Sequence, residues 1–262
     1  MTRSNHGFRP VRPYDGLILQ VQKRGKQRVL SVFTRQEGLL RLFVSERSRG
    51  RSGSGTFMPL GEITFDAGEQ GDVLSLREYE CRGNEAMMNL TWDHYVYSQI
   101  FVEMVLHLMP YRQADGGVYG MLLRYSRLLS AKDPRVLTII AGWQLTGLAG
   151  FYPDVDTVRV FSSFYGQGRY YFGDEGLAEM QEEKLSPEIR QLWKRLLQYR
   201  WEREETLRFS AKGLAALEWL LYSYVEQCSE KKAAIISIAG AFVRTVRKNQ
   251  IFRRRSFCFS VF

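Results

Sequence analysis

The chain has 262 residues, of which 45% are hydrophobic, so it can bury a sizeable core and global disorder is excluded. No apolar run approaches the roughly 18 residues of a membrane-spanning helix, and the basic N-terminal stretch lacks the apolar segment of a secretory signal. Cys81, Cys228 and Cys258 are too widely spaced for a disulfide or metal framework. We therefore expect a protein of the reducing cytoplasm.

The positive charge of the chain is concentrated at its two ends. Residues 1–51 hold 12 Lys and Arg against 3 Asp and Glu, and residues 231–262 hold 8 basic residues and no acidic one, within a net charge of +9. Residues 52–85 and 86–230 carry net charges of −5 and −3. A solvated surface normally mixes the two signs, so this segregation predicts a polyanionic partner, either nucleic acid or an anionic membrane surface.

Five short strands are predicted in the N-terminal part of the chain. Apolar and β-branched residues, bounded by turn signals, dominate residues 14–21, 28–34, 38–45, 57–65 and 72–79. A loop rich in Gly, Ser and Arg, residues 47–55, separates the third of these segments from the fourth. This pattern predicts a small closed barrel of the OB-fold type, with an SH3-like barrel as the structural alternative.

A helical pattern replaces the strands after Gly83. Apolar residues recur every three or four positions in residues 87–109, and further helices are predicted over residues 118–129, 133–148, 186–201 and 210–227. Asp133-Pro134, Ser186-Pro187 and Ser210 are start signals for the last three helices, whereas residues 151–185 have no regular pattern.

The predicted fold class is therefore α+β. We expect an OB-fold DNA-binding domain over residues 1–83 and a mostly α-helical domain over residues 84–232. The basic tail, residues 233–262, does not continue the pattern before it. It is either an extra basic helix or a poorly ordered end.

The loop at residues 50–56 has only a superficial likeness to a phosphate-binding P-loop. Thr56 stands where that motif needs Lys, and the following Phe57-Met58-Pro59 will not open a helix. We expect a flexible basic loop, in which Arg47, Arg49 and Arg51 contact DNA phosphates.

No catalytic or metal site is predicted. His94 and His107 lie on one predicted helix but 13 residues apart, beyond the spacing of a shared metal site. There is no GxSxG nucleophile motif, and neighbouring carboxylates such as Glu182-Glu183 are typical of solvated faces. We expect neither a metal nor another cofactor.

Basic residues crowd the predicted barrel strands, with Tyr14, Phe33 and Phe43 among them. Positive charge combined with stacking rings is how small barrels hold single strands, although Phe33 and Phe43 are expected to face the barrel interior. The basic side chains would bind backbone phosphates without reading sequence. The predicted DNA-binding residues are Lys23, Arg24, Lys26, Arg28, Arg35, Arg41, Arg47, Arg49 and Arg51.

Several segments, in order, resemble the RecO family of DNA repair proteins. Residues 14–19 (YDGLIL), 32–41 (VFTRQEGLLR) and, after the Arg-rich loop, 57–60 (FMPL) are similar to its N-terminal strands. Residues 102–109 (VEMVLHLM) resemble its first long helix, and residues 145–153 (LTGLAGFYP) resemble its helix end of the pattern LLxxLGxxP. The resemblance runs from about residue 14 to residue 230.

The resemblance implies an OB-fold joined to a helical bundle. It implies binding of single- and double-stranded DNA, annealing of complementary strands, and help in loading RecA onto DNA coated with single-strand-binding protein. The implied partners are RecR and the acidic tail of the single-strand-binding protein, and the implied location is the cytoplasm, at the nucleoid. No membrane and no enzymatic activity are implied.

The sequence departs from the family pattern in three places. Many members carry a four-Cys zinc site where residues 154–176 have no cysteine, so we expect no zinc. Many members have basic residues in the helix ending near Phe151, where only Arg135 is close here, and the contact with the acidic tail is therefore open. The segment after Ala233 has no counterpart in the resemblance.

Two other functions stay open. A metal-dependent enzyme acting on nucleic acid, such as a nuclease or nucleotidyl transferase, requires a cluster of three or more carboxylates or histidines. A basic peripheral membrane protein would use the tail instead.

Overall fold

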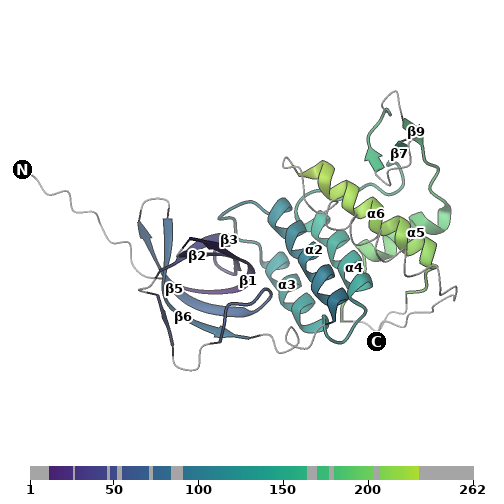
Figure 1. Ribbon diagram of the computed structural model, residues 1–262. Coiled ribbons are helices and arrows are strands. Elements are labelled where there is room, and N and C mark those ends of the chain that lie inside the picture. The colour runs from purple at the N-terminus through teal and green to yellow at the C-terminus, as the bar shows by residue number, and fades with distance from the viewer. Residues whose placement is uncertain are drawn as a thin grey trace, which may run out of the picture. The chain divides into compact units, whose positions relative to one another are not determined.

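The computed structural model describes residues 12–25, 27–45, 48–51, 55–70, 73–83, 91–163, 170–176, 180–202 and 207–229 (Figure 1). The predictions for Lys26, Arg47, the Arg24 side chain and the tail fall outside this part of the chain. Backbone contacts divide the chain into two compact units, residues 1–90 with 109–127 and residues 91–108 with 128–262.

The first unit is built on a closed β-barrel. Its strands are β1 Arg12–Arg24, β2 Gln27–Thr34, β3 Gly38–Val44, β4 Arg49–Gly50, β5 Glu62–Gln70 and β6 Val73–Arg82. The strand order is β3-β2-β1-β5-β6-β4, and parallel pairing of β3 with β6 closes the ring. Five long strands in this order form a Greek-key barrel of the OB-fold type, with the two-residue β4 added beside β6. The predicted fold class is confirmed.

Alternate residues of each long strand fill the barrel interior, as the two-residue period of a strand requires. The interior cluster consists of Tyr14, Ile18, Leu30, Val32, Leu40, Leu42, Ile63, Phe65, Ala67, Leu74, Leu76 and Cys81. The ring of Tyr14 stacks on that of Phe65 with centroids 5.1 Å apart. Because each fully buried Leu or Ile contributes roughly 1.5–3 kcal/mol, this alternation is a main source of the barrel's stability.

The strand predicted over residues 57–65 is shifted, because β5 begins only at Glu62. A turn precedes it: the Gly61 N–H donates to the Met58 carbonyl at 3.1 Å, and Leu60 has a φ of 59°. Leu60 is fully buried, and its N–H donates to the Ile18 carbonyl at 2.6 Å. The apolar residues of this segment therefore serve packing around a turn, which single-sequence patterns do not separate from a strand.

Helix α3, Gly116–Leu128, belongs with the barrel unit and lies beside the barrel in Figure 1. The Ser126 hydroxyl donates to the Leu60 carbonyl at 3.0 Å, and the Arg112 N–H donates to the Leu39 carbonyl at 2.9 Å. The domain boundary expected at residue 83 would instead assign α3 to the helical domain. Periodicity identifies a helix and its apolar face, but it does not say which core that face covers.

The second unit contains α2 Trp92–Leu108, α4 Pro134–Leu148, α5 Pro187–Leu197 and α6 Ala211–Cys228. Three of these helices begin where predicted, because Asp133, Ser186 and Ser210 each accept a hydrogen bond from the backbone N–H three residues on. Gly142 lets the helices approach closely: a Cβ there would lie 2.6 Å from Leu221 and 2.9 Å from Met104.

Residues 151–185, expected to be irregular, include a small sheet. Strand β7, Val160–Ser163, pairs with both β8, Tyr170–Phe172, and β9, Met180–Glu182. Strands of three or four residues are too short for alternation to reveal them. Phe172 of this sheet packs against α6, with its ring centroid 4.9 Å from that of Tyr224.

Candidate nucleic-acid interface

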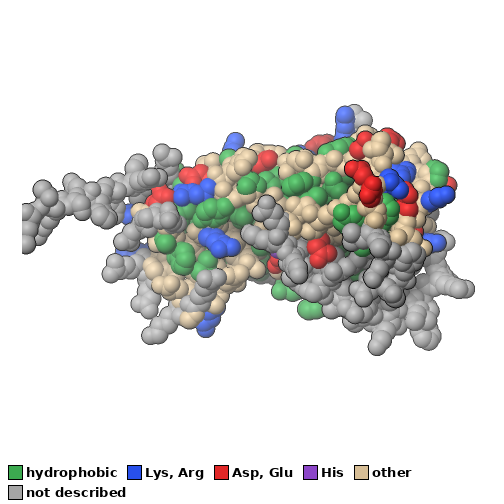
Figure 2. All heavy atoms as spheres, turned by 90° about the horizontal axis from the view of Figure 1, so that it is seen from above, with side chains coloured by type: hydrophobic (Ala, Val, Ile, Leu, Met, Phe, Trp, Pro, Cys, Tyr) green, Lys and Arg blue, Asp and Glu red, His purple; other side chains and the backbone are tan. Residues whose placement is uncertain are grey.

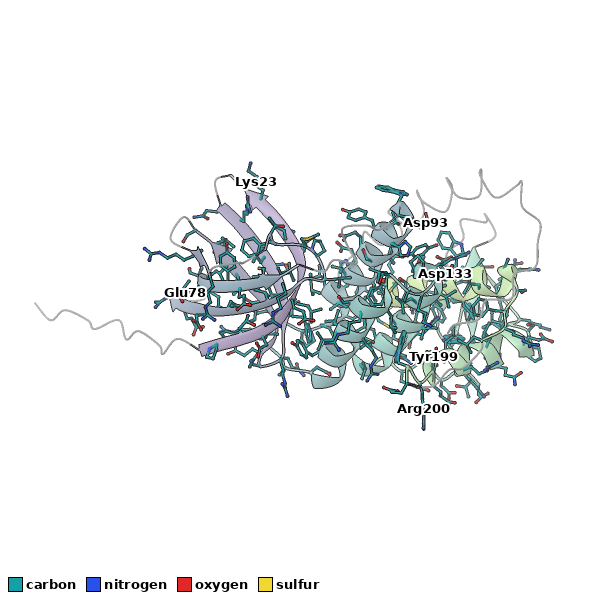
Figure 3. All side chains as sticks on the ribbon, turned by 90° about the horizontal axis from the view of Figure 1, so that it is seen from below. Lys23, Glu78, Asp93, Asp133, Tyr199 and Arg200 are labelled. Atoms are coloured by element: carbon teal, nitrogen blue, oxygen red, sulfur yellow. The ribbon has the colours of Figure 1, made fainter. Side chains whose placement is uncertain are left out.

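The β1–β2 hairpin carries a pair of cations near its tip. Lys23 and Arg28 lie directly opposite each other in the strand register, and both side chains are exposed. Lys23 projects outward from the barrel (Figure 3). Like charges directly opposite on paired strands are destabilising, and in the described part of the chain neither residue has an ion-pair partner. The pair therefore presents uncompensated positive charge to an approaching anion.

Arg35 and Arg41 extend the cationic set along the same strands. Arg35 lies in the β2–β3 turn, at the other end of β2 from Arg28, so the two are about 23 Å apart along an extended strand. Arg41 lies in the middle of β3, opposite Ser31, with its side chain exposed. The predicted residues thus follow the β1–β3 strands in sequence and do not converge on one point. On the face seen in Figure 2, Lys and Arg side chains occupy separate spots over the barrel.

Arg49 lies in β4, which pairs with β6, and Arg51 directly follows this strand. Arg49 is exposed. Arg51 is engaged by two carboxylates, since its guanidinium lies 3.2 Å from Asp66 and 3.8 Å from Glu78. Its charge is therefore largely compensated, and it is the least available of the predicted DNA contacts that the structure describes.

The strands β5 and β6 carry several carboxylates on their outer side. Asp66 and Glu78 are direct cross-strand partners, and Glu80 is opposite Thr64. Figure 3 marks Glu78 on a different part of the barrel from Lys23. These three carboxylates are paired with cations, Asp66 and Glu78 with Arg51 and Glu80 with Arg82, so this side carries mixed charge. The cations Lys23 and Arg28, which are unpaired within the described ranges, therefore favour the β1–β3 strands as the approach for nucleic acid.

The aromatic residues named from the sequence are not placed as expected. Phe33 is fully buried but stands outside the interior cluster, because its neighbour Val32 occupies the inward position and strand side chains alternate. Phe43, two residues after Arg41 on the outer side, is half-buried and also outside that cluster. The expectation that both rings face the interior is wrong. Of the three rings named from the sequence, that of Tyr14 faces the barrel interior.

One aromatic residue at this surface was not found from the sequence. Tyr111 is 47% exposed, and its hydroxyl oxygen accepts a hydrogen bond from the Arg41 N–H at 3.3 Å. Tyr111 also forms a parallel bridge with Leu39. It lies 70 residues from Arg41 in the chain, so no local motif connects the two.

The helical unit uses its own cation internally. The Arg135 guanidinium donates to Glu218, whose carboxylate is 1% exposed and also accepts hydrogen bonds from the hydroxyls of Tyr97 and Tyr222. Arg135 is the basic residue of α4 for which the contact with an acidic tail is open from the sequence. Its charge is already compensated by this buried partner.

Residues 154–176 do not fit the zinc site of many RecO-like sequences, because they lack cysteine. Ion pairs and hydrogen bonds connect the described residues of this region instead. Arg159 forms a two-pronged pair with Glu182, at 3.1 and 2.7 Å, and the Lys194 ammonium lies 2.5 Å from Asp156. Within the described ranges, no group of three or more His, Cys, Asp and Glu is placed to hold a metal ion.

The family profile described as "Recombination protein O C terminal" matches residues 90–233, which is more than half of the chain. The chain belongs to the RecO family. Its role therefore lies in recombination and repair, and the resemblance noted in the sequence is confirmed. The matched segment includes α2 to α6, whereas the barrel lies before it.

Other comparisons add little to the RecO assignment. No curated protein matches the chain. Two solved structures of the copper protein CusF from Escherichia coli are weakly similar. A copper(II)-bound CusF variant has 11% sequence identity and a TM-score of 0.23, and the match covers 28% of this chain and 92% of the CusF chain. Apo-CusF has 14% sequence identity and a TM-score of 0.24, and the match covers 32% of this chain and 99% of the CusF chain. Such scores carry no weight for fold or function.

No helix in the described part of this RecO-family chain is long and apolar enough to cross a membrane.

Proposed function

We propose that this chain is a DNA-binding recombination mediator without catalytic activity. It binds single- and double-stranded DNA, anneals complementary strands and assists the loading of RecA onto DNA coated with single-strand-binding protein. Membership of the RecO family supports the general role. The observation that carries the DNA-binding part is the exposed pair Lys23 and Arg28, opposite each other and without a carboxylate partner among the described residues.

The proposed contacts are electrostatic and nearly independent of sequence. Cationic side chains on a strand surface bind phosphates and release condensed counterions, which makes affinity strongly salt-dependent. The proposed DNA-binding residues remain Lys23, Arg24, Lys26, Arg28, Arg35, Arg41, Arg47, Arg49 and Arg51, with Arg51 weakened by its two ion pairs.

Annealing requires two negative strands to be brought together, and a second positive surface favours this. The basic tail, residues 233–262, is the proposed second contact. RecR and the acidic tail of the single-strand-binding protein are the proposed protein partners. The proposed location is the cytoplasm, at the nucleoid.

The alternative function is a metal-dependent enzyme acting on nucleic acid. Incubating labelled single- and double-stranded DNA with the protein, with and without Mg²⁺, separates the two. We expect intact DNA in both conditions. Strand cleavage or nucleotide addition that depends on Mg²⁺ would establish the alternative.

The DNA-binding proposal is tested by charge removal at matched sites. Lys23→Gln removes a cation from the hairpin, whereas Arg200→Gln removes an exposed cation from the helical unit. We expect weaker binding of single-stranded DNA by the first variant and unchanged binding by the second, measured by fluorescence anisotropy at one salt concentration. Equal losses in both variants would mean that net charge alone, and not the barrel, determines binding.

A further inference from the structure

The segment containing Tyr111 and Arg112 covers a stretch of the β3 edge. Strand β6 pairs with β3 at Leu42 and Phe43, beyond this stretch. The Arg112 N–H donates to the Leu39 carbonyl at 2.9 Å, and the Arg41 N–H donates to the Tyr111 hydroxyl at 3.3 Å. Both backbone groups belong to the edge of β3, so the tyrosine is held to the barrel at its backbone and at its hydroxyl.

Tyr111 remains 47% exposed despite these two anchors. An exposed ring that is already fixed in position loses little conformational entropy when another flat group packs on it. Aromatic side chains stack readily on nucleic-acid bases, because every base presents a π-face. The geometry therefore provides a rigid, accessible stacking surface at the edge of the barrel.

The charges around this ring suit an anionic strand. The Arg41 side chain is exposed and, among the described residues, has no ion-pair partner. The carboxylates nearby are compensated: Arg112 lies 3.4 Å from Glu37 and 2.8 Å from Glu69. Glu37 also accepts a hydrogen bond from the Tyr14 hydroxyl at 2.9 Å. Arg41, whose N–H meets the Tyr111 hydroxyl, thus contributes a cation that is unpaired among the described residues, while the neighbouring acids are paired.

We propose that Tyr111 stacks on a base of single-stranded nucleic acid while Arg41 binds an adjacent phosphate. Tyr111 thereby gives the barrel a preference for single strands over duplex. The inference rests on the proposed DNA-binding function and deepens it. Bases in a duplex are already stacked on each other, so only an unpaired strand offers a free base face to the ring.

The test uses the full chain with two variants, Tyr111→Leu and Tyr111→Phe. The leucine removes the ring, while the phenylalanine keeps the ring and removes only the hydroxyl bond to Arg41. Anisotropy is measured with an oligothymidine strand, a duplex of equal length and an abasic strand of equal length. We expect Tyr111→Leu to weaken binding of oligothymidine about fivefold or more, from the loss of one base–aromatic stack. Tyr111→Phe, which keeps the ring and its backbone anchor but loses the hydroxyl anchor, should lose much less affinity than Tyr111→Leu.

The same variants should bind the duplex and the abasic strand as the wild type does, and the salt slope should not change, because no phosphate contact is lost. Wild-type affinity of Tyr111→Leu for oligothymidine would overturn the stacking role while leaving DNA binding intact. Equal losses on all three ligands would also overturn it, because the residue would then act through the barrel structure. If the wild type binds none of the ligands, the proposed DNA-binding function itself fails, and the stacking role with it.

Discussion

Glu218 places a carboxylate in the interior of the helical unit, where it joins three helices. It accepts hydrogen bonds from Arg135 of α4, Tyr97 of α2 and Tyr222 of its own helix α6. Removing one partner of a buried ion pair leaves the other charge uncompensated. We expect Glu218→Gln to lower the free energy of unfolding by roughly 3 kcal/mol, at the lower end for such pairs because the Arg135 side chain is 24% exposed.

Urea unfolding monitored by circular dichroism measures this loss. Glu226→Gln is the matched control, since it removes a half-buried carboxylate from the same helix that has no ion-pair partner among the described residues. The control should change stability by less than about 0.5 kcal/mol. Similar losses in both variants would show that the Glu218 network contributes nothing beyond ordinary surface electrostatics.

The same network makes stability depend on alkaline pH. Burial, and then the Glu218 carboxylate, raise the pKa of Tyr97 and of Tyr222 above the ordinary value. The folded chain therefore keeps phenolic protons that the unfolded chain releases above about pH 10. This stabilisation is complete below pH 10 and is lost as the pH rises further. Tyr222→Phe should flatten the decline of unfolding free energy between about pH 9.5 and 11, and an unchanged decline would contradict the assignment.

At the scale of elements, two glycines have the same left-handed backbone conformation but different space around them. Comparing them separates the cost of backbone strain from the cost of steric crowding. Gly25, in the β1–β2 hairpin, has a φ of 60°, and among the described residues no atom lies within 4 Å of where its Cβ would stand. Gly38, which begins β3, has a φ of 68°, and its Cβ would lie 1.9 Å from the Gln113 carbonyl oxygen. That oxygen belongs to the segment that covers the β3 edge.

Gly25→Ala should therefore cost about 1 kcal/mol of unfolding free energy, from the left-handed backbone alone. Gly38→Ala should cost about 3 kcal/mol, because overpacking against backbone is added to the same strain. Thermal unfolding of the two variants makes the comparison. Equal costs would mean that residues 111–113 do not pack on β3 as described.

The elements that the sequence predicted well are those with local causes. The alternation of apolar residues predicted the barrel strands, and Asp133, Ser186 and Ser210 predicted three helix starts. Each of these signals depends only on residues within one turn or strand. The β7–β9 sheet was not predicted because its strands are very short. Phe33 was misassigned because burial on the outer side of a barrel strand gives the same apolar signal as burial inside.

The candidate site shows the same limit. Composition predicted the cationic strands, and the register adds that Lys23 faces Arg28. Pairings distant in sequence were not predictable: Arg51 is compensated by Asp66 and Glu78, and Tyr111 is joined to Arg41 across 70 residues. These contacts depend on how segments distant in the chain come together, which single-residue patterns do not encode.

At the scale of the whole molecule, positive and negative charges are segregated along the chain and not only within the barrel. Residues 52–230 are net acidic, whereas both ends are strongly basic. If the tail is a second DNA contact, a truncation that removes residues 233–262 should slow strand annealing more than it weakens binding of one strand. Annealing rates compared at matched occupancy of single-stranded DNA measure this. Equal rates at equal occupancy would rule out a two-surface mechanism.

The central claim is that the β1–β2 hairpin binds nucleic-acid phosphates, and the salt dependence of affinity tests it most directly. The dissociation constant for single-stranded DNA should be measured over a salt series for the wild type and for Lys23→Gln combined with Arg28→Gln. Each lost phosphate contact lowers the magnitude of the slope of log affinity against log salt by about 0.7, so the double variant should lose about 1.4. A double variant with the affinity and slope of the wild type would contradict the claim.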